Sequence, residues 1–363
     1  MEFDEIGLRH VKLEMKYTFE TSFGAISERN LLVLEARKGD QWFYGETSPL
    51  QDPVYNHEST FTAKEVISRY VVEALKNCSS IEDYHERVSD IKCHNLAKAS
   101  GDQLLYHKKS VEEGRPISEL IGGTQDYAEC GIVLGVTDKN EIVSKVQEYV
   151  DAGYKRLKMK IKPGKDIEHV RKVRENFPDL EIMADANSAY TLDDVEHLKK
   201  LDQFDLSMIE QPLGDNDIVN HGTLNEKIET PICLDESIHS DEDVKRAARI
   251  GAAEIINLKP QRVSGIYESE KLNQSCRENG MEMWIGSLVE SGLGQSLLVI
   301  ASSLSEVNFP GDIASSDKYY ENDIIDPEIE VKDGRVKVPE RPGFVGEVDR
   351  EILKEKTVER REF

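Results

Sequence analysis

Cysteine is scarce in this chain, and no two cysteines are close enough to form a CxxC motif. An odd number of widely spaced cysteines excludes a complete disulfide framework and is typical of reduced thiols in a cytoplasmic protein. The nine histidines show no metal-binding spacing. The five cysteines are Cys78, Cys93, Cys130, Cys233 and Cys276.

Long apolar runs and an excess of positive charge are also missing. The longest apolar stretches, such as residues 132–136, are far too short to span a bilayer, and the acidic start MEFDEIG does not resemble a signal peptide. The net charge of −24 at pH 7 disfavours nucleic-acid phosphates and anionic membranes as partners. We therefore expect a soluble, cytoplasmic protein. The negative net charge is still compatible with a small anionic substrate, because a metal ion and a few lysines make the potential positive locally.

From about residue 125, short apolar runs alternate with longer, charged segments of helical pattern. Such runs are typical of parallel strands buried on both faces. Thr191 and Ser240 are expected helix N-caps, and Gly251 and Gly280 expected helix ends. Eight repeats predict an α/β fold with a closed, TIM-like barrel, whereas an open sheet would show fewer units and a glycine-rich nucleotide turn. The runs are 130–136, 157–161, 182–186, 206–210, 232–235, 255–259, 283–286 and 309–314.

The first 125 residues have a different pattern. Alternating runs at 8–19, 30–38 and 41–47 predict an antiparallel meander, and helical patterns follow over 62–75 and 80–113. We predict an α+β capping domain over residues 1–125 and the barrel with the active site over 126–327. The C-terminal segment, 328–363, is expected to pack back on the cap.

Five charged residues stand at the ends of consecutive apolar runs, each 24 or 25 residues after the previous one: Lys160, Asp185, Glu210, Asp235 and Lys259. Because a barrel carries its active site at the C-terminal strand ends, these side chains should converge. Three carboxylates without histidine or cysteine favour Mg²⁺, with Mn²⁺ as its substitute. A lysine beside a divalent cation should have a lowered pKa and act as a base.

Neighbouring residues carry weaker signals. Lys158 points inward as Lys160 does, and either supports the metal ligands or pairs with a carboxylate. Asn187 is either a substrate hydrogen-bonder or a turn residue. Glu236 is expected to face away from the barrel lumen in an ion pair behind the sheet, and His239 to lie in a loop.

A metal that grips a carboxylate while a lysine removes the adjacent C–H proton would make an enediolate. Two rival hypotheses remain. A lysine at the end of the sixth strand also serves class I aldolases as a Schiff base, although that mechanism has no use for three strand-end carboxylates. A non-catalytic protein with a structural metal would not need a lysine on each side.

Five motifs resemble those of the muconate-lactonizing subgroup of the enolase superfamily: Lys158-Met-Lys160, Asp185-Ala-Asn187, Glu210-Gln-Pro212, Asp235-Glu-Ser237 and Lys259-Pro260. The resemblance covers nearly the whole chain. It implies a (β/α)₇β barrel with an α+β cap and frequent oligomers, so we expect a homo-oligomer. It also implies that Asp185, Glu210 and Asp235 bind Mg²⁺ and that Lys160 and Lys259 are the acid/base pair.

Within this subgroup, residues 21–24, 286–294 and 310–317 resemble o-succinylbenzoate synthases that also racemise N-succinylamino acids. The resemblance implies Mg²⁺-dependent dehydration of 2-succinyl-6-hydroxy-2,4-cyclohexadiene-1-carboxylate, a step of menaquinone biosynthesis, by α-proton abstraction. The substrate would be a small carboxylate. The candidate substrate-binding residues are Lys158, Asn187, Phe23, Tyr55, Ser287, Leu288, Val289 and Asp312.

Two departures from the family pattern lie near the site. Related members often read Lys-Pro-Gly-Arg-Val-Gly-Gly where this chain has Lys259-Pro-Gln-Arg-Val-Ser-Gly265, and Gly-Gly where it has Gly286-Ser287. Because of these departures, the substrate is not decided. The enzyme could be a synthase, a racemase, both, or a dipeptide epimerase. Arg262 is retained, and either lowers the pKa of Lys259 or closes a surface ion pair.

Overall fold

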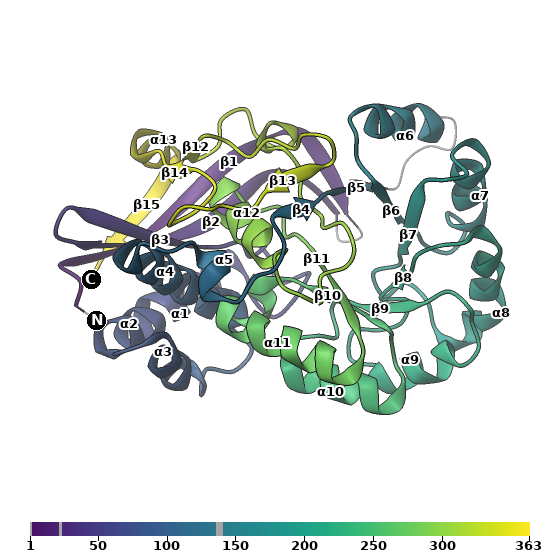
Figure 1. Ribbon diagram of the computed structural model, residues 1–363, viewed down its shortest axis with the longest axis horizontal. Helices are drawn as coiled ribbons and strands as arrows, with labels where there is room; N and C mark the ends of the chain where they lie inside the picture. Colours follow the sequence, from purple (N-terminus) through teal and green to yellow (C-terminus); the bar gives the residue numbers. More distant parts are fainter. Residues whose placement is uncertain (1, 22–23, 136–140) are drawn as a thin grey trace.

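A curled sheet of seven parallel strands forms the centre of the molecule, as the apolar runs predict (Figure 1). The computed structural model describes residues 2–21, 24–135 and 141–363. Successive strands are neighbours in the sheet, which is the order of a barrel. The strands are β5 (Gly131–Leu134), β6 (Arg156–Lys160), β7 (Glu181–Asp185), β8 (Ile209–Glu210), β9 (Ile232–Leu234), β10 (Ile255–Leu258) and β11 (Glu282–Ile285).

The eighth apolar run closes the barrel without forming a regular strand. Backbone hydrogen bonds join Asn308 to Met283 of β11, and Gly311 to Gly131 at the start of β5. Gly311 forms an isolated parallel bridge with Cys130. The segment around residues 307–312 therefore connects the two edge strands of the sheet.

Helices follow the barrel strands and cover their outer face (Figure 1). The predicted caps are confirmed: Thr191 forms a capping box, Ser240 precedes α10, and Gly251 and Gly280 end helices with left-handed φ values of 63° and 66°. The helices are α6 (Ile142–Asp151), α7 (Ile167–Asn176), α8 (Val195–Leu198), α9 (Ile218–Asn225), α10 (Asp241–Ile250), α11 (Ile266–Asn279) and α12 (Gly292–Ala301). Short 3₁₀ turns lie at Leu192–Asp194, Lys199–Phe204, Pro260–Val263 and Ser316–Lys318.

The N-terminal part forms an antiparallel meander and a group of helices beside the barrel. The strands are β1 (Glu5–Thr21), β2 (Gly24–Lys38) and β3 (Gln41–Thr47). The helices are α1 (Thr60–Val66), a π turn (Ile67–Val71), α2 (Val72–Asn77), α3 (Ile81–Val88), α4 (Asn95–Glu113) and α5 (Ile117–Leu120). The continuous helical pattern expected over 80–113 is broken between α3 and α4, where Cys93 has a left-handed φ of 58°.

The C-terminal part returns to the meander. Strand β15 (Thr357–Glu362) pairs with β1, which makes the sheet order β15-β1-β2-β3 and brings the two ends of the chain close together (Figure 1). Strand β4 (Tyr127–Glu129) pairs with β13 (Arg335–Lys337), and β12 (Ile325–Asp326) with β14 (Glu347–Val348). Helix α13 (Arg350–Lys356) precedes β15. The division into domains at 125 and 327 stays our proposal.

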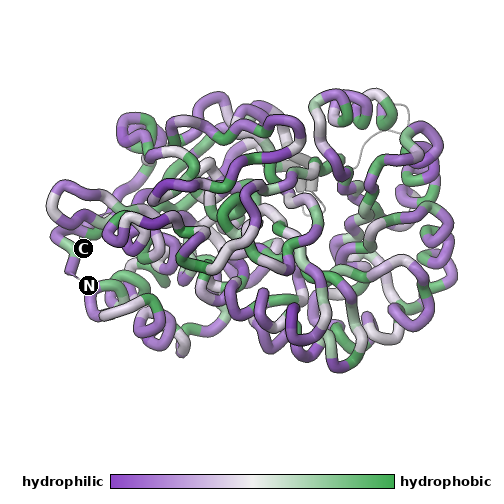
Figure 2. The backbone as a smooth tube through the Cα atoms, in the orientation of Figure 1, coloured by the Kyte–Doolittle hydropathy of each residue, from purple (hydrophilic) through white to green (hydrophobic). Residues whose placement is uncertain are grey.

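One continuous apolar core runs through both parts of the molecule. Apolar stretches follow the central strands and α12, whereas the outer helices alternate between hydrophilic and hydrophobic residues (Figure 2). Among the described residues, no helix is long and apolar enough to cross a membrane. All five cysteines are free thiols.

Candidate active site

The parallel register places the predicted site residues at one edge of the sheet. Lys160 is paired with Asp185 across β6 and β7, and Asp185 with Glu210 across β7 and β8. Asp235 and Lys259 follow directly after β9 and β10. Because neighbouring parallel strands end at the same height, equal spacing in the chain becomes proximity in space.

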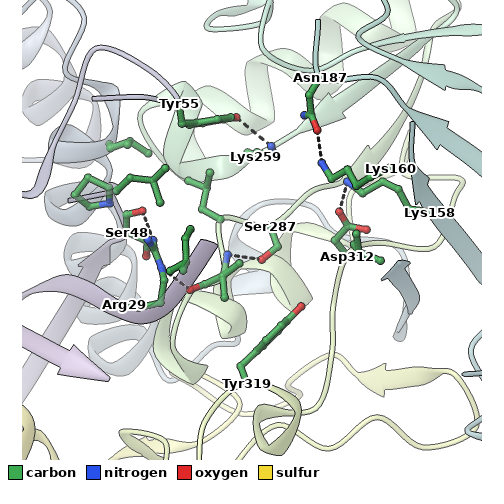
Figure 3. A pocket seen from close by; sticks show the side chains of 17 residues that line it. Arg29, Ser48, Tyr55, Lys158, Lys160, Asn187, Lys259, Ser287, Asp312 and Tyr319 are labelled. Atoms are coloured by element: carbon green, nitrogen blue, oxygen red, sulfur yellow. Dashed lines mark hydrogen bonds and ion pairs between the residues drawn. The ribbon is translucent and has the colours of Figure 1, made fainter. Parts of the chain in front are cut away.

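Each of the two predicted lysine bases is paired with one of the predicted metal ligands. Lys160 Nζ lies 2.6 Å from Asp185 Oδ2, and Lys259 Nζ lies 2.8 Å from Asp235 Oδ2. The strands that carry the two lysines are separated by three others, β7, β8 and β9. The two ammonium groups therefore reach the cavity from different strands, as Figure 3 shows.

Lys158 lies deeper in the barrel than Lys160. Its Nζ is 2.5 Å from Asp312 Oδ2, 3.3 Å from Glu210 Oε2 and 3.4 Å from Asp185 Oδ2. It also lies 4.8 Å from the centre of the Trp284 ring, where a cation–π contact is favourable. These carboxylates outweigh the effect of burial and raise the pKa of Lys158 well above its ordinary value. Lys158 therefore pairs with carboxylates, and two of these, Asp185 and Glu210, are predicted metal ligands, so both alternatives for Lys158 stay open.

One of the three predicted metal ligands, Glu210, lies where its negative charge is disfavoured. Glu210 is fully buried, and burial together with the Asp185 carboxylate raises the pKa of Glu210 well above its ordinary value. Its Oε1 accepts a hydrogen bond of 2.6 Å from Asn257 Nδ2. A divalent cation would relieve this repulsion, and an all-oxygen donor set suits Mg²⁺. The donor set therefore fits this ion in chemistry and charge.

In the present structure, the carboxylates of Asp185 and Asp235 pair with lysines and do not point towards one common centre. Within the described parts of the chain, no three acidic, histidine or cysteine side chains stand close enough together to hold a metal ion. Asp185 faces Lys160, and Asp235 faces Lys259 and Arg262. Holding a metal would require these carboxylates to turn from their lysine partners towards a shared centre.

Arg262 is a buried partner of Asp235, so of its two alternatives the surface ion pair does not hold. It is 1% exposed, and its Nη1 contacts Asp235 Oδ1. It also donates from Nε to Ile238 O and from Nη2 to Asn257 O. The 3₁₀ turn after Lys259 causes this burial, because it folds the side chain back under the end of β10.

The pKa of Lys259 depends on its burial and on its charged neighbours. Burial and Arg262 lower it, but the Asp235 carboxylate outweighs them and raises the pKa of Lys259 above its ordinary value. Lys259 and Arg262 in turn hold the pKa of Asp235 well below its ordinary range, against the effect of burial. Sharing Asp235 with another cation would weaken the pairing and lower the pKa of Lys259.

Glu236 does not face away from the lumen, and the expected ion pair behind the sheet is wrong. Strand β9 ends at Leu234, so the alternation of a strand no longer applies to Glu236. Its Oε1 accepts a hydrogen bond of 3.0 Å from Asn187 Nδ2, and Asn187 Oδ1 accepts one of 2.6 Å from Lys160 Nζ. Burial and the adjacent Asp235 raise the pKa of Glu236 to about 7. Asn187 thus links Glu236 to Lys160.

Lys160 and Lys259 face a cavity between barrel and cap. The space in and above this cavity, open solvent included, is about 840 Å³. Both lysine bases line it, together with the predicted substrate-binding residues Lys158, Asn187, Tyr55, Ser287, Leu288, Val289 and Asp312. Tyr55 Oη lies 3.0 Å from Lys259 Nζ. Phe23 lies outside the described residues.

Several lining residues were missed by the sequence analysis. They come from the cap, from strand β5 and from a connection near the C-terminus: Ile26, Arg29, Ser48, Pro49, Leu50, Leu96, Val133 and Tyr319. One signal was visible. Arg29 shares the strand face of Leu31 and Val33, and a charged residue on an apolar face calls for an explanation. The other residues carry no chemical signal in the sequence.

Comparison with known proteins assigns this architecture. The family model described as "Enolase C-terminal domain-like" matches residues 141–352. The chain belongs to the enolase superfamily. A member of that superfamily from Listeria innocua has a solved structure with a TM-score of 0.95 and 35% identity, covering 100% of this chain and 99% of that one. The barrel and capping domain are therefore those of the enolase superfamily.

Curated relatives narrow the superfamily to a group of enzymes. An o-succinylbenzoate synthase from Geobacillus kaustophilus is 38% identical over 94% of this chain and 92% of its own length. An N-succinylamino acid racemase from Amycolatopsis sp is 36% identical over 95% of each chain. This protein is thus an enolase-superfamily enzyme similar to both.

Proposed function

We propose that this enzyme is an o-succinylbenzoate synthase that also racemises N-succinylamino acids. The observation that carries the proposal is the placement of Lys160 and Lys259 on separate strands around one cavity, each paired with a different strand-end carboxylate. Both reactions begin with removal of a proton next to a carboxylate. A positioned base contributes about 10²–10⁴-fold to such a step.

In the synthase reaction, a cyclohexadiene carboxylate loses water and becomes aromatic. Lys160 takes the α-proton, and the same proton then leaves on the departing hydroxyl as water. Lys259 remains an ammonium group and stabilises the negative charge that develops on the substrate. The position of Lys259 in the wall of the cavity supports this electrostatic role.

Racemisation uses both lysines as acid and base. One lysine removes the α-proton, and the other delivers a proton to the opposite face of the same carbon. The reverse reaction exchanges the two roles. This second activity is favoured by the hydrogen-bonded position of each lysine, since Asn187 holds Lys160 and Tyr55 holds Lys259.

Asp185, Glu210 and Asp235 are the proposed holders of Mg²⁺, with Mn²⁺ as its substitute. When bound, the ion neutralises charge on the substrate carboxylate and so makes the α-proton more acidic. A dipeptide epimerase from Cytophaga hutchinsonii, 21% identical with a TM-score of 0.91, was crystallised with Mg and a dipeptide, and it covers 100% of both chains. At this identity, the likeness supports only a shared fold. The proposal that this enzyme binds Mg²⁺ is based on its own three carboxylates.

Location and assembly belong to the same proposal. Five free thiols support a reducing, cytoplasmic compartment. A homo-oligomer is proposed from the resemblance alone. Light scattering of the purified enzyme measures its mass directly, and a monomer at micromolar concentration would contradict this proposal.

The decisive experiment assays two reactions in parallel. One arm follows o-succinylbenzoate formation with Mg²⁺, with Mn²⁺ and after EDTA treatment. The other follows deuterium exchange at Cα of N-succinylamino acids and of dipeptides by proton NMR in D₂O. Exchange of dipeptides alone would replace the proposal by a dipeptide epimerase. Full activity in EDTA with borohydride trapping of the substrate would instead support a Schiff-base aldolase.

A further inference from the structure

Arg29 is a buried cation that faces the cavity from the cap. It lies on β2 opposite Leu13 of β1, beyond the point where β3 stops pairing with β2. Its side chain turns over the end of β3, where Nη2 donates to Ser48 O at 2.6 Å and Nε to Val289 O at 3.2 Å. Figure 3 shows Arg29 and Ser48 on one side of the cavity and Lys160 on the other.

The positive charge of Arg29 has no anion in contact among the described residues. The residue is 2% exposed, the described contacts of its guanidinium are backbone carbonyls, and no carboxylate oxygen within the described ranges approaches it to 4.0 Å. Glu46 and Glu290 lie within electrostatic reach, but their oxygens accept hydrogen bonds from the Ser48 and Ser287 hydroxyls. A buried charge that lacks a contacting counter-charge is costly. An anionic ligand would supply the missing partner.

We propose that Arg29 binds a second carboxylate of the substrate, the one at the far end of the succinyl chain. This inference rests on the proposed function, in which both substrates carry a succinyl group. The two ends of the cavity are then cationic, with Lys158 and Lys160 at the barrel and Arg29 at the cap. The same cavity is also lined by apolar side chains that suit two methylene groups, those of Ile26, Leu50 and Leu288.

Arginine suits this role better than lysine. Its planar guanidinium presents five N–H donors and binds a carboxylate through two parallel hydrogen bonds. Nε and Nη2 are engaged with Val289 and Ser48, while no described residue accepts a hydrogen bond from Nη1. The two backbone bonds fix the plane of the group before a ligand arrives. The same bonds tie the cap to the barrel, which is the competing, purely structural role.

The test compares two ligands that differ only at the distal end. Titration calorimetry with Mg²⁺ present measures the Kd of o-succinylbenzoate and of 2-butanoylbenzoate, in which a methyl group replaces the distal carboxylate. We expect the wild type to prefer the dicarboxylate by about 10–100-fold, because a hydrogen bond to a charged group is strong. Arg29→Gln should reduce this preference to within about threefold and leave the affinity for 2-butanoylbenzoate nearly unchanged.

Two further variants separate binding from structure. Arg29→Lys keeps the charge and should keep part of the preference. Arg174 also donates to backbone carbonyls, those of Phe204 and Leu180, but lies on α7, so Arg174→Gln should keep the full preference. Thermal unfolding followed by circular dichroism checks that each variant is folded.

Each outcome decides one question. No preference in the wild type, an unchanged preference in Arg29→Gln, or an equal loss of affinity for both ligands would overturn the role of Arg29. Failure of the proposed function looks different, because the wild type would then form no o-succinylbenzoate and exchange no α-proton of N-succinylamino acids. An active wild type with an unaltered preference in Arg29→Gln refutes the inference and leaves the proposed function intact.

Discussion

Around the cavity, the carboxylates of the barrel mouth and the buried charges Glu58 and Arg29 of the cap are held in different ways. At the barrel mouth, carboxylates meet cations directly, as in the pairs Asp185–Lys160 and Asp235–Lys259. In the cap, the buried Glu58 accepts hydrogen bonds from the backbone N–H groups of Leu96 and Ala97. Arg29 likewise donates to backbone carbonyls.

This difference follows from the two architectures. Parallel strands end side by side, so charged residues at their ends are brought into contact, and removing one leaves its partner buried without compensation. The ends of the meander and of the cap helices expose free backbone groups, which satisfy charges without a second charge. We therefore expect substitutions in the barrel mouth to affect the chemical step and substitutions in the cap to affect substrate binding.

The largest effect should come from the two lysines. Lys160→Ala and Lys259→Ala should each reduce racemisation by about 10²–10⁴-fold, because each removes a positioned base. Each variant should still exchange the α-proton of one enantiomer, and the enantiomer should differ between them. Proton NMR in D₂O on each enantiomer measures this. The same exchange pattern in both variants would show that the lysines do not face opposite sides of the carbon.

The synthase reaction distinguishes the lysines further. Lys259→Arg keeps the positive charge but is a poor base, because the guanidinium stays protonated. It should therefore spare more synthase than racemase activity, whereas Lys160→Arg should lose both. Initial rates of the two reactions for the same enzyme preparation give the ratio. An equal loss of both activities in Lys259→Arg would contradict the electrostatic role of Lys259.

The next effect concerns the carboxylate with the least compensated charge. Glu210→Gln keeps the shape of the side chain and its hydrogen bond with Asn257 but removes the charge. We expect Mg²⁺ affinity to fall at least about tenfold and most activity to be lost. Calorimetric titration with Mg²⁺, with circular dichroism as the check on folding, measures it. An unchanged affinity would remove Glu210 from the metal site.

A smaller and different effect is expected from the cap. Leu50→Ala shortens an apolar side chain that lines the cavity, and should raise KM several-fold while kcat changes little, as mainly uniform binding requires. Phe61→Ala is the matched control, because Phe61 is 68% exposed on cap helix α1. Steady-state kinetics compare the two. A fall in kcat at constant KM would place part of the chemistry in the cap.

The smallest effect is on stability and depends on pH. His107 of α4 is buried, and its Nδ1 accepts a hydrogen bond from Tyr44 N at 3.1 Å. Burial lowers the pKa of His107 to about 3, below the ordinary value near 6.5. The unfolded chain therefore binds the extra proton first, and the stability from neutral His107 is present above pH 6.5 and lost as the pH falls towards 3.

His107→Asn keeps an acceptor but does not titrate. The free energy of unfolding of the wild type should fall by up to about 1 kcal/mol per pH unit more than that of the variant below pH 6. Urea unfolding at several pH values from 7 to 4.5 measures the difference. Parallel curves for the two proteins would show that His107 does not carry this dependence.

The barrel could be predicted because its signal is periodic. Apolar runs at nearly constant spacing, five of them ended by a charged residue, define strands and the edge at which they meet. Helix caps such as Thr191 and Gly251 could also be predicted, because a cap depends on only a few neighbouring residues. The break between α3 and α4 was missed, since the residues there carry no proline or glycine that would mark it.

The sequence by itself determined the strand order, the ends of the strands and the five charged residues that gather there. Only the tertiary structure decided which charges pair, that Arg262 and Glu236 are buried beside Asp235, and that Arg29 reaches the cavity. The reason is physical. A strand end depends on periodicity along the chain, whereas the surroundings of Arg29 are made by residues 48 and 289, which are brought together by packing between cap and barrel.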